Sequence, residues 1–288
     1  MLSVLLPVYN WQIVPLVTEL HKQCAVLNID YEIICIDDCS TNFKQENKQV
    51  AESLTITYIE LTENIGRSKT RNLLAEKAKF ENLLFLDCDI AIGESFMVNY
   101  LSFLNTNKVI CGGLQYQTEI PKADKLLRWK YGNKHEVKPL KVRNRKPYLS
   151  FKSCNFLIPK SVFEQVKFNE HFTSYGHEDT LFASTLEQKK VELLHINNPI
   201  IHLGIDNASD FLNKTRQAIQ NLLRHKIHYQ NIKLLKFVRK LEKLKADKIY
   251  LKGYQKNKTN ILKNLLSDKP KLINFARFKL GYLLELKN

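Results

Sequence analysis

The sequence predicts an α/β protein in which a mixed, mainly parallel sheet is flanked by helices, followed by a basic helical extension. Over the first half of the 288 residues, short apolar runs alternate with segments of helical spacing. This alternation is typical of βαβ units. After Ser209 the pattern is wholly helical. The composition, 44% hydrophobic and 25% charged with 9 Gly and 8 Pro, excludes a collagenous, low-complexity or largely disordered chain.

Four strands are expected in the first half, each ending at a polar turn: Ser3–Leu6, Tyr31–Ile36, Thr55–Ile59 and Leu83–Leu86. Helical spacing separates them, as from Ile13 to Cys24. Ligands of parallel sheets bind beyond the carboxyl ends of the strands. The first residues to consider are therefore Pro7–Asn10, Asp37–Thr41 and Asp87–Asp89.

The second half is less regular. The segment 121–148 is rich in Lys and Arg with few apolar anchors, and we expect a long loop or mobile flap there. Next come a strand (151–158), a short helix from Ser161, a helix (178–189) and two strands (191–195 and 199–203). In the extension, Leu234, Val238, Leu241 and Leu244 form one apolar stripe. Gly253 is expected to interrupt a helix, and Pro270 to mark the start of another.

The positive charge is confined to the extension. Residues 210–288 hold 20 Lys and Arg against 5 Asp and Glu, whereas the first 209 residues hold 24 of each. This step places a domain boundary near residue 208 and predicts two parts, 1–208 and 209–288. Three roles remain open for the extension: docking on an anionic membrane, pairing with another subunit, or capping the core with a solvated basic face.

The chain is expected to be cytoplasmic, and peripheral on the cytosolic face of the membrane if the extension docks on lipid. No apolar run approaches the ~18 residues that span a bilayer. The apolar start ends at Pro7 without a basic leader or a cleavage site. The six cysteines form no CxxC pair and are interpreted as reduced core thiols.

The sharpest chemical feature is the Asp87-Cys88-Asp89 sequence at the end of a buried strand. Alternate residues of a strand share a face, so both carboxylates can converge on one ligand. Near a diphosphate they would hold Mg²⁺ or Mn²⁺, which take oxygen ligands and bridge to phosphates. The alternative is that the two carboxylates cap the next turn.

Four segments occur in order at βα spacing: SVLLPVYN (3–10), IDDCST (36–41), NIGRSKTRN (64–72) and LDCD (86–89). Together they resemble the nucleotide-sugar half of family 2 glycosyltransferases, which have the GT-A fold, over about residues 1–115. Residues 116–208 would then be the acceptor and catalytic half. Cys39 stands where the family often has Gly, and Thr70 where it often has Ala.

The resemblance implies a donor site made of Pro7, Tyr9, Asp37, Asp38, Asn64, Gly66, Arg71 and Asp87. An aromatic ring at Tyr9 can pack against a base, Asp38 can accept from the uracil N3–H, and Asp37 can hold a ribose hydroxyl. Alternatives remain open. Pro7 and Tyr9 also suit a plain strand-to-helix turn, the two aspartates suit a helix cap, and Arg71 suits a solvated helix face.

A second segment, Gly176-His177-Glu178-Asp179, precedes an apolar helix. It resembles the Gly-x-Glu-Asp segment of inverting galactosyl- and N-acetylgalactosaminyltransferases, including chondroitin-type polymerases, although those usually have an aromatic residue or Gly in place of His177. The resemblance implies that Asp179 is the catalytic base and that Glu178 orients acceptor hydroxyls. Helix capping is the alternative.

A histidine near the position of His202 completes the metal shell of similar enzymes, so the predicted metal ligands are Asp87, Asp89 and His202. His177 and His195 are expected to be structural or to lie on the acceptor side. The alternative is that His202 is structural, as a lone histidine in a strand often is.

The resulting hypothesis is an inverting hexosyltransferase that uses Mn²⁺ or Mg²⁺ and a UDP-sugar, a UDP-hexose or UDP-N-acetylhexosamine. Its acceptor would be a glycan or lipid-linked saccharide in the synthesis of a surface polysaccharide, and no nucleic acid is expected as partner. One alternative, a sugar-phosphate nucleotidyltransferase, would need a Gly-rich phosphate loop that residues 7–10 lack. The other is a basic RNA-binding protein that stacks bases on aromatic residues of the extension: Tyr229, Tyr250, Tyr254 and Phe275. The oligomeric state is left open.

Overall fold

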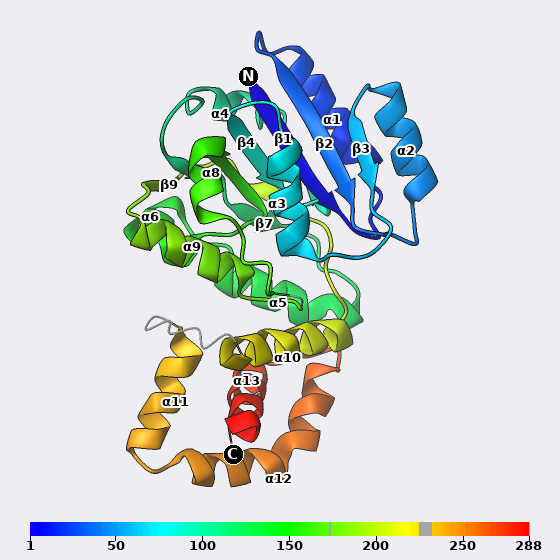
Figure 1. The fold of residues 1–288 in the computed structure, drawn as a ribbon. Helices are drawn as coiled ribbons and strands as arrows, with labels where there is room; N and C mark the ends of the chain where they lie inside the picture. The colour runs from blue at the N-terminus through cyan, green and yellow to red at the C-terminus, as the bar shows by residue number, and fades with distance from the viewer. Residues whose placement is uncertain (173, 225–231, 288) are drawn as a thin grey trace. The chain divides into compact units, whose positions relative to one another are not determined.

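The computed structural model describes residues 1–172, 174–224 and 232–287, which form two compact units. The first, here called the sheet unit, comprises Met1–Gln117, Val137–Thr173 and Glu178–Gly204. The second, here called the helical unit, comprises Thr118–Glu136, Ser174–His177 and Ile205–Asn288. Figure 1 shows the strands in the first unit and only helices in the second.

The sheet unit is built on a seven-stranded sheet in the order β3-β2-β1-β4-β8-β6-β9. Strands β1 to β4 run parallel, and β8 is antiparallel to both neighbours. A second sheet has the order β5-β10-β7. The strands are β1 (Leu2–Val8), β2 (Tyr31–Asp37), β3 (Thr57–Glu60), β4 (Asn82–Leu86), β5 (Ile90–Ala91), β6 (Val109–Cys111), β7 (Leu114–Tyr116), β8 (Asn155–Pro159), β9 (Leu193–His195) and β10 (Ile200–His202). The predicted fold class, a mixed and mainly parallel sheet flanked by helices, is confirmed.

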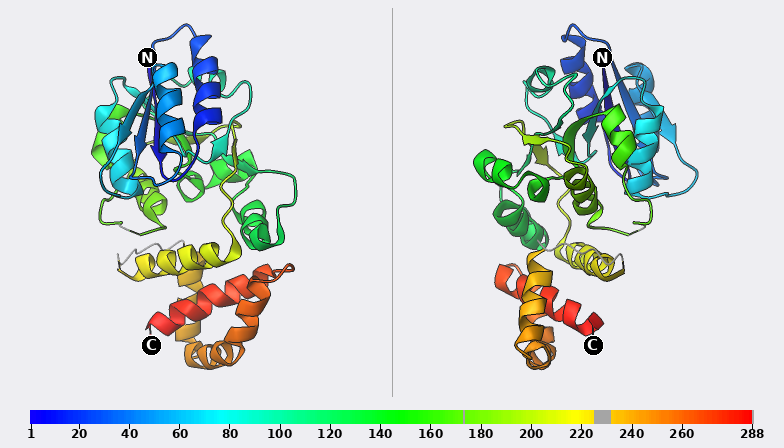
Figure 2. Two further views of the ribbon diagram at one scale, coloured as in Figure 1. Left: turned by 90° about the vertical axis from the view of Figure 1, so that its right-hand side faces the viewer. Right: turned by 60° about the vertical axis from the view of Figure 1, so that its left-hand side comes forward.

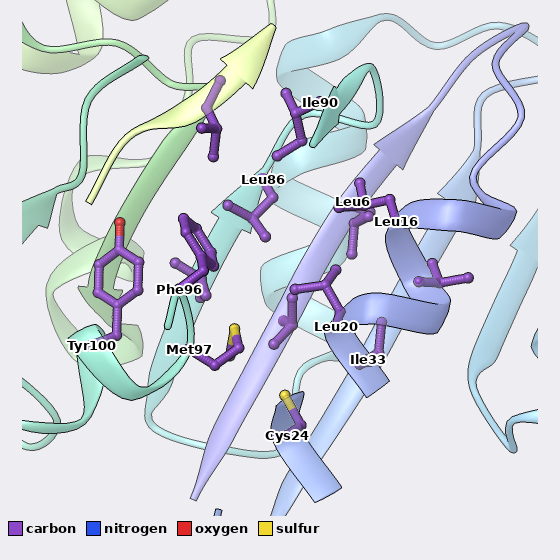
Figure 3. Close-up of a cluster of buried hydrophobic side chains, with 14 of the residues drawn as sticks. Leu6, Leu16, Leu20, Cys24, Ile33, Leu86, Ile90, Phe96, Met97 and Tyr100 are labelled. Atoms are coloured by element: carbon purple, nitrogen blue, oxygen red, sulfur yellow. The ribbon is translucent and has the colours of Figure 1, made fainter. Parts of the chain in front are cut away.

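Both faces of the large sheet are apolar because alternate residues of each strand point to opposite faces. Along β1, Leu6 joins a cluster with α1 and the α4 region (Figure 3), whereas Leu5 joins a cluster with α3, α8 and α9. Figure 2 shows helices on both sides of the strands. The helices of this unit are α1 (Val14–Ala25), α2 (Lys44–Ser53), α3 (Arg67–Lys77), α4 (Val98–Leu101), α6 (Leu140–Arg145), α7 (Pro147–Ser150), α8 (Lys160–Val166) and α9 (Glu178–Gln188).

The prediction of a long loop over 121–148 is wrong. This segment holds the 3₁₀ turn η1 (Ala123–Lys125), α5 (Leu126–His135), α6 and the first half of α7. Part of the reason is a basic side chain that is buried instead of solvated. Arg143 is 7% exposed and donates to the backbone oxygens of Cys111 and Ile196 at 3.4 and 2.9 Å. A buried arginine therefore anchors α6 where the sequence shows few apolar residues.

The helical unit contains η1, α5, α10 (Ala208–Arg224), α11 (Lys233–Lys243), α12 (Asp247–Leu265) and α13 (Leu272–Lys287). Helix α13 packs against α10, α11 and α12, as its central place among them in Figure 1 shows. Leu234, Val238 and Leu241 of the predicted stripe face this packing, with Val238 1% exposed, whereas Leu244 is 65% exposed and does not. Gly253 lies inside α12, so the predicted interruption there is wrong.

The described residues contain no helix that is both long and apolar enough to cross a bilayer. All six cysteines are free thiols, four of them buried. Two aromatic side chains of the RNA-binding alternative, Tyr254 and Phe275, are buried at 4% and 2% exposure and are not available for base stacking. Tyr229 lies outside the described residues.

Candidate active site

Polar residues meet at the carboxyl ends of β1, β2 and β4, the edge at which ligands of such sheets bind. Asp38 follows β2 and is 5% exposed. Its carboxylate accepts from the backbone N–H groups of Ile65 and Gly66 at 2.7 and 3.0 Å, and its backbone oxygen accepts from the Asn64 side chain. Gly66 has a φ of 84°, which glycine adopts without strain. Asp38 thus holds together three of the predicted donor residues.

Asp37 is fully buried and also forms hydrogen bonds within the protein. Its carboxylate accepts from the Ser40 backbone N–H and from the Tyr58 hydroxyl, both at 2.6 Å. The turn-capping alternative therefore describes what Asp37 does in this structure. An ionised carboxylate offers about four lone-pair sites, so these bonds do not use up the acceptor capacity of either aspartate.

Pro7 lies near the end of β1, and Tyr9 follows that strand with its side chain 54% exposed. An exposed aromatic ring beyond a strand end is available to stack on a planar ligand.

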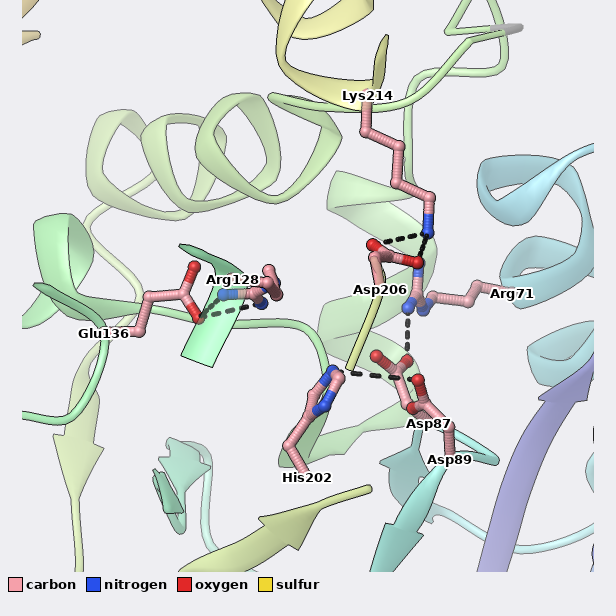
Figure 4. A network of polar contacts seen from close by, with 8 residues as sticks. All are labelled: Arg71, Asp87, Asp89, Arg128, Glu136, His202, Asp206 and Lys214. Atoms are coloured by element: carbon pink, nitrogen blue, oxygen red, sulfur yellow. Dashed lines mark hydrogen bonds and ion pairs between the residues drawn. The ribbon is translucent and has the colours of Figure 1, made fainter. Parts of the chain in front are cut away.

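Arg71, on α3, reaches the first carboxylate of the Asp87–Asp89 pair. Its Nη2 donates to Asp87 Oδ1 at 2.6 Å, and the side chain is only 2% exposed (Figure 4). Phe168 lies against the guanidinium, 5.3 Å from ring centroid to Cζ. Within the described residues, Arg71 Nε and Nη1 have no hydrogen-bond partner. The solvated-face alternative for Arg71 is wrong, and the two remaining donors are available to a bound anion.

Asp89, in the turn between β4 and β5, faces His202 of β10 (Figure 4), with Asp89 Oδ2 3.7 Å from His202 Nε2. The backbone oxygen of Asp89 accepts from the N–H groups of Leu203 and Gly204. Burial raises the pKa of Asp89 and the charge of Asp87 adds to the rise, while His202 opposes it. The His202 ring stacks on Tyr116, with 5.4 Å between centroids. Two of the three predicted metal ligands are therefore adjacent.

The acidic pair of the second motif opens α9. Glu178 is 8% exposed, whereas the Asp179 side chain is 18% exposed. The Lys152 Nζ lies 3.3 Å from Asp179 Oδ2, and the Thr180 hydroxyl donates to Oδ1. Burial raises the pKa of Glu178, and the neighbouring Asp179 raises it further.

Arg67, at the first position of α3, connects the two motifs electrostatically. Its charge lowers the pKa of both Asp89 and Glu178, against the larger effect of burial, and Arg71 also lowers that of Glu178. The carboxylates of both motifs therefore lie near the charges of α3: Arg67 acts on Asp89 and Glu178, and Arg71 on Asp87 and Glu178. This links the two acidic motifs at one site of the sheet unit.

Sequence reasoning missed four residues of this site: Arg67, Tyr116, Lys152 and Gly204. Only Arg67 had a usable signal, since it lies four residues before Arg71 and therefore on the same helix face. His195, by contrast, is structural: it is 2% exposed and lies between Arg143 and the Pro147 backbone oxygen. His177 has a φ of 73° in the turn before α9.

Asp89 and His202 fit a divalent cation that shares its coordination with a substrate. Among the described residues, no group of three or more His, Cys, Asp or Glu is arranged to hold a metal ion. Two ligands, each about 2.1 Å from one ion, lie roughly 3–4 Å apart, so the 3.7 Å between Asp89 and His202 suits that geometry. A carboxylate and an imidazole suit Mn²⁺, and phosphate oxygens can supply further ligands.

The arrangement is that of the GT-A glycosyltransferases: a mainly parallel sheet flanked by helices, with carboxylates at the strand ends. Solved structures share this fold. One is Staphylococcus aureus TarS 1–349 in complex with UDP-GlcNAc, at 19% identity and a TM-score of 0.52, covering 77% of this chain and 66% of that one. Another is mannosyltransferase PcManGT from Pyrobaculum calidifontis with GDP-Man and Mn²⁺, at 14% identity and a TM-score of 0.54, covering 80% and 65%.

The family model of glycosyl transferase family 2 matches residues 3–167, and the chain belongs to this family. It is also 24% identical to chondroitin synthase of Escherichia coli over 284 residues, which cover 85% of this chain and 40% of the relative. The chain thus spans less than half of that protein. Membership of a family of glycosyltransferases favours neither the nucleotidyltransferase nor the RNA-binding alternative.

Proposed function

We propose that this chain is an inverting glycosyltransferase that moves a hexose or N-acetylhexosamine from a UDP-sugar to a hydroxyl of a saccharide acceptor. The observation that carries the proposal is the meeting of two acidic motifs around α3. Asp87 binds Arg71, and Asp89 faces His202. The charges of Arg67 and Arg71 lower the pKa of Glu178. A UDP-sugar complex of a protein with the same fold supports the choice of donor.

The donor half follows from the strand ends. The exposed Tyr9 ring would stack on the uracil, and Asp38 would accept from the uracil N3–H with its remaining lone pairs. Asp37 would hold the ribose. The unpartnered N–H groups of Arg71 would donate hydrogen bonds to an oxygen of the UDP-sugar, for which a guanidinium is well suited. Asn64 and Gly66 act indirectly because they fix the Asp38 carboxylate.

Asp89 and His202 would hold the divalent cation, with Asp87 shared between it and the ribose. When bound, Mn²⁺ or Mg²⁺ supplies positive charge that stabilises the departing diphosphate. No general acid is then required on the leaving-group side. The protein's part is to fix the two side chains: backbone N–H groups anchor Asp89, and Tyr116 sets the plane of the His202 ring.

Inversion at the anomeric carbon requires one carboxylate to take the proton from the attacking hydroxyl. We assign this role to Asp179 because its side chain is the more exposed of the pair and an acceptor can reach it. Lys152 orients its Oδ2. Burial and Asp179 raise the pKa of Glu178, so Glu178 keeps its proton to a higher pH than an ordinary glutamate and can donate to an acceptor hydroxyl.

The donor and metal assignments are tested by hydrolysis of a panel of UDP- and GDP-sugars. One UDP-sugar should be preferred, activity should be lost in EDTA, and Mn²⁺ should restore it. In Asp89→Asn, hydrolysis should be low and Mn²⁺ should not restore it, while the melting temperature stays close to that of the wild type. Full activity in EDTA, or with Asp89→Asn, contradicts the metal assignment.

The base assignment is tested by a matched pair of isosteric variants. General-base assistance contributes roughly 10²–10⁴-fold, so Asp179→Asn should lower kcat by that factor and leave UDP affinity unchanged. Glu178→Gln should act mainly through the KM for the acceptor. If Glu178→Gln instead lowers kcat and Asp179→Asn does not, the base is Glu178.

A further inference from the structure

Large apolar side chains are exposed on α11, at its C-terminal cap and in the first turn of α12. Phe237, Leu244 and Ile249 are 48%, 65% and 74% exposed. They are not needed for the packing of the helical unit, because the inward stripe of α11 provides it through Val238 and its neighbours. The three lie within thirteen residues of the chain, and contiguous apolar exposure on a folded protein indicates an interaction surface.

The same region is strongly basic. Residues 233–252 hold eight Lys and Arg against two Asp and Glu, and one of those acids, Glu242, pairs with Lys287. The exposed residues of this region that concern us are named the α11–α12 surface: Lys233, Lys236, Phe237, Lys240, Lys243, Leu244, Lys245, Lys248, Ile249 and Lys252.

On α11 the basic and apolar members share one side. Phe237, Lys240 and Leu244 are spaced by three and four residues, and Lys236 and Lys243 flank them, so they form one helix face. Apolar residues between lysines are typical of helices that lie in a membrane interface. The lysine stems can bury their methylenes while the ammonium groups stay at the headgroups.

We propose that the α11–α12 surface docks on an anionic lipid bilayer. Phe237, Leu244 and Ile249 enter the headgroup region, and the surrounding lysines bind lipid phosphates. The inference rests on the exposure and charge of the helical unit and does not depend on the donor chemistry.

Two other occupants fit the surface less well. Protein interfaces are depleted of lysine at their centres, whereas here lysines separate the exposed apolar residues, which disfavours a second copy of the chain. Single-stranded nucleic acid binds on stacked aromatic rings. Of the aromatic residues considered for stacking, Tyr254 and Phe275 are buried.

The test is co-sedimentation of the full chain with phosphatidylcholine vesicles, with and without phosphatidylglycerol, at low and high salt. We expect at least about tenfold tighter binding to the anionic vesicles and weaker binding at high salt. The triple variant Lys240→Gln/Lys243→Gln/Lys248→Gln should lose on the order of 100-fold, since each well-placed lysine contributes about fivefold. Leu244→Ser/Ile249→Ser should lose about tenfold or more.

Control variants make comparable changes on the sheet unit. Val26→Ser replaces a side chain that is 82% exposed, and Lys48→Gln/Lys77→Gln/Lys189→Gln removes three exposed lysines. These controls should bind vesicles like the wild type. All variants should keep the wild-type melting temperature and donor hydrolysis, which separates loss of docking from loss of folding.

Three results would overturn the proposal. One is equal binding to neutral and anionic vesicles, or none to either. Another is wild-type vesicle binding by both surface variants. The third is a Leu244→Ser/Ile249→Ser protein that changes its oligomeric state but not its vesicle binding, because the occupant would then be a second copy.

Discussion

Gly204 offers a sharp test of the Asp89–His202 site because it contains no catalytic group of its own. It follows β10 directly, and a Cβ built on it would lie 2.1 Å from Asp89 Oδ2 and 2.8 Å from Cγ. Its φ is not in the left-handed region, so alanine is compatible with the backbone. Any effect of Gly204→Ala must therefore come from the added methyl group.

The size of the effect follows from the overlap. Ordinary van der Waals contact begins at about 3.4 Å, so the Asp89 carboxylate must move by about 1.3 Å. The backbone of Asp89 is tied to Leu203 and Gly204, and the Asp89 Cβ also lies 2.9 Å from the added atom. The side chain must therefore rotate, and the backbone must shift slightly as well. Rotation takes Oδ2 out of its position opposite His202. A misplacement of about 1 Å can cost roughly 10²-fold in rate, and overpacking costs about 1–3 kcal/mol of stability.

We therefore expect Gly204→Ala to lower kcat/KM for the nucleotide sugar by about 10²-fold. The Mn²⁺ concentration at half-maximal activity should rise as well. Gly93→Ala is the matched control, since nothing lies within 4 Å of a Cβ at that position. Wild-type Mn²⁺ dependence and turnover in Gly204→Ala would refute the placement of Asp89 in the metal site. Melting temperatures show whether the variant is folded.

Two further predictions concern buried basic groups. Burial lowers the pKa of His195 to about 4 and Arg143 adds to this, so the unfolded chain binds a proton between about pH 6.5 and 4 that the folded chain does not. Stability should rise with pH across that window by about 3 kcal/mol, and urea unfolding of His195→Gln, unlike His21→Gln, should lack this part of the slope. Arg71→Lys keeps the charge but removes the planar guanidinium with its two unpartnered nitrogens, so UDP affinity measured by calorimetry should fall by about tenfold or more. Unchanged affinity would exclude Arg71 from the donor site.

The strand ends were predictable because a parallel sheet brings the residues after each strand to one edge. The sequence alone could not decide whether Asp37 and Asp38 cap turns or bind a ligand. The structure shows that capping is real: Asp38 binds two backbone N–H groups of the turn that contains Gly66. Its use in a donor site stays a prediction, but the two roles are compatible since each oxygen keeps a lone pair.

The segment 121–148 was not predictable by the same reasoning. Hydrophobic periodicity detects helices that bury apolar side chains, whereas α6 is anchored by the buried guanidinium of Arg143. Strands β6 and β7 have three residues each, which is too short for an alternation of apolar and polar residues to be recognised. The partners of Lys152 and Gly204 are 27 and 115 positions away in the chain, so only the fold could reveal them.

The two acidic motifs depend on one helix for their electrostatics. Clustered carboxylates repel one another, and burial makes each charge more costly. At this site Arg67, in the first turn of α3, lowers the pKa of both Asp89 and Glu178 against the effect of burial. Arg71 also lowers that of Glu178, and His202 that of Asp89. Gly66 and Asp38 fix the start of that helix. The turn in which Asp38 binds Gly66 therefore sets the position of the arginine charges near the carboxylates of both motifs.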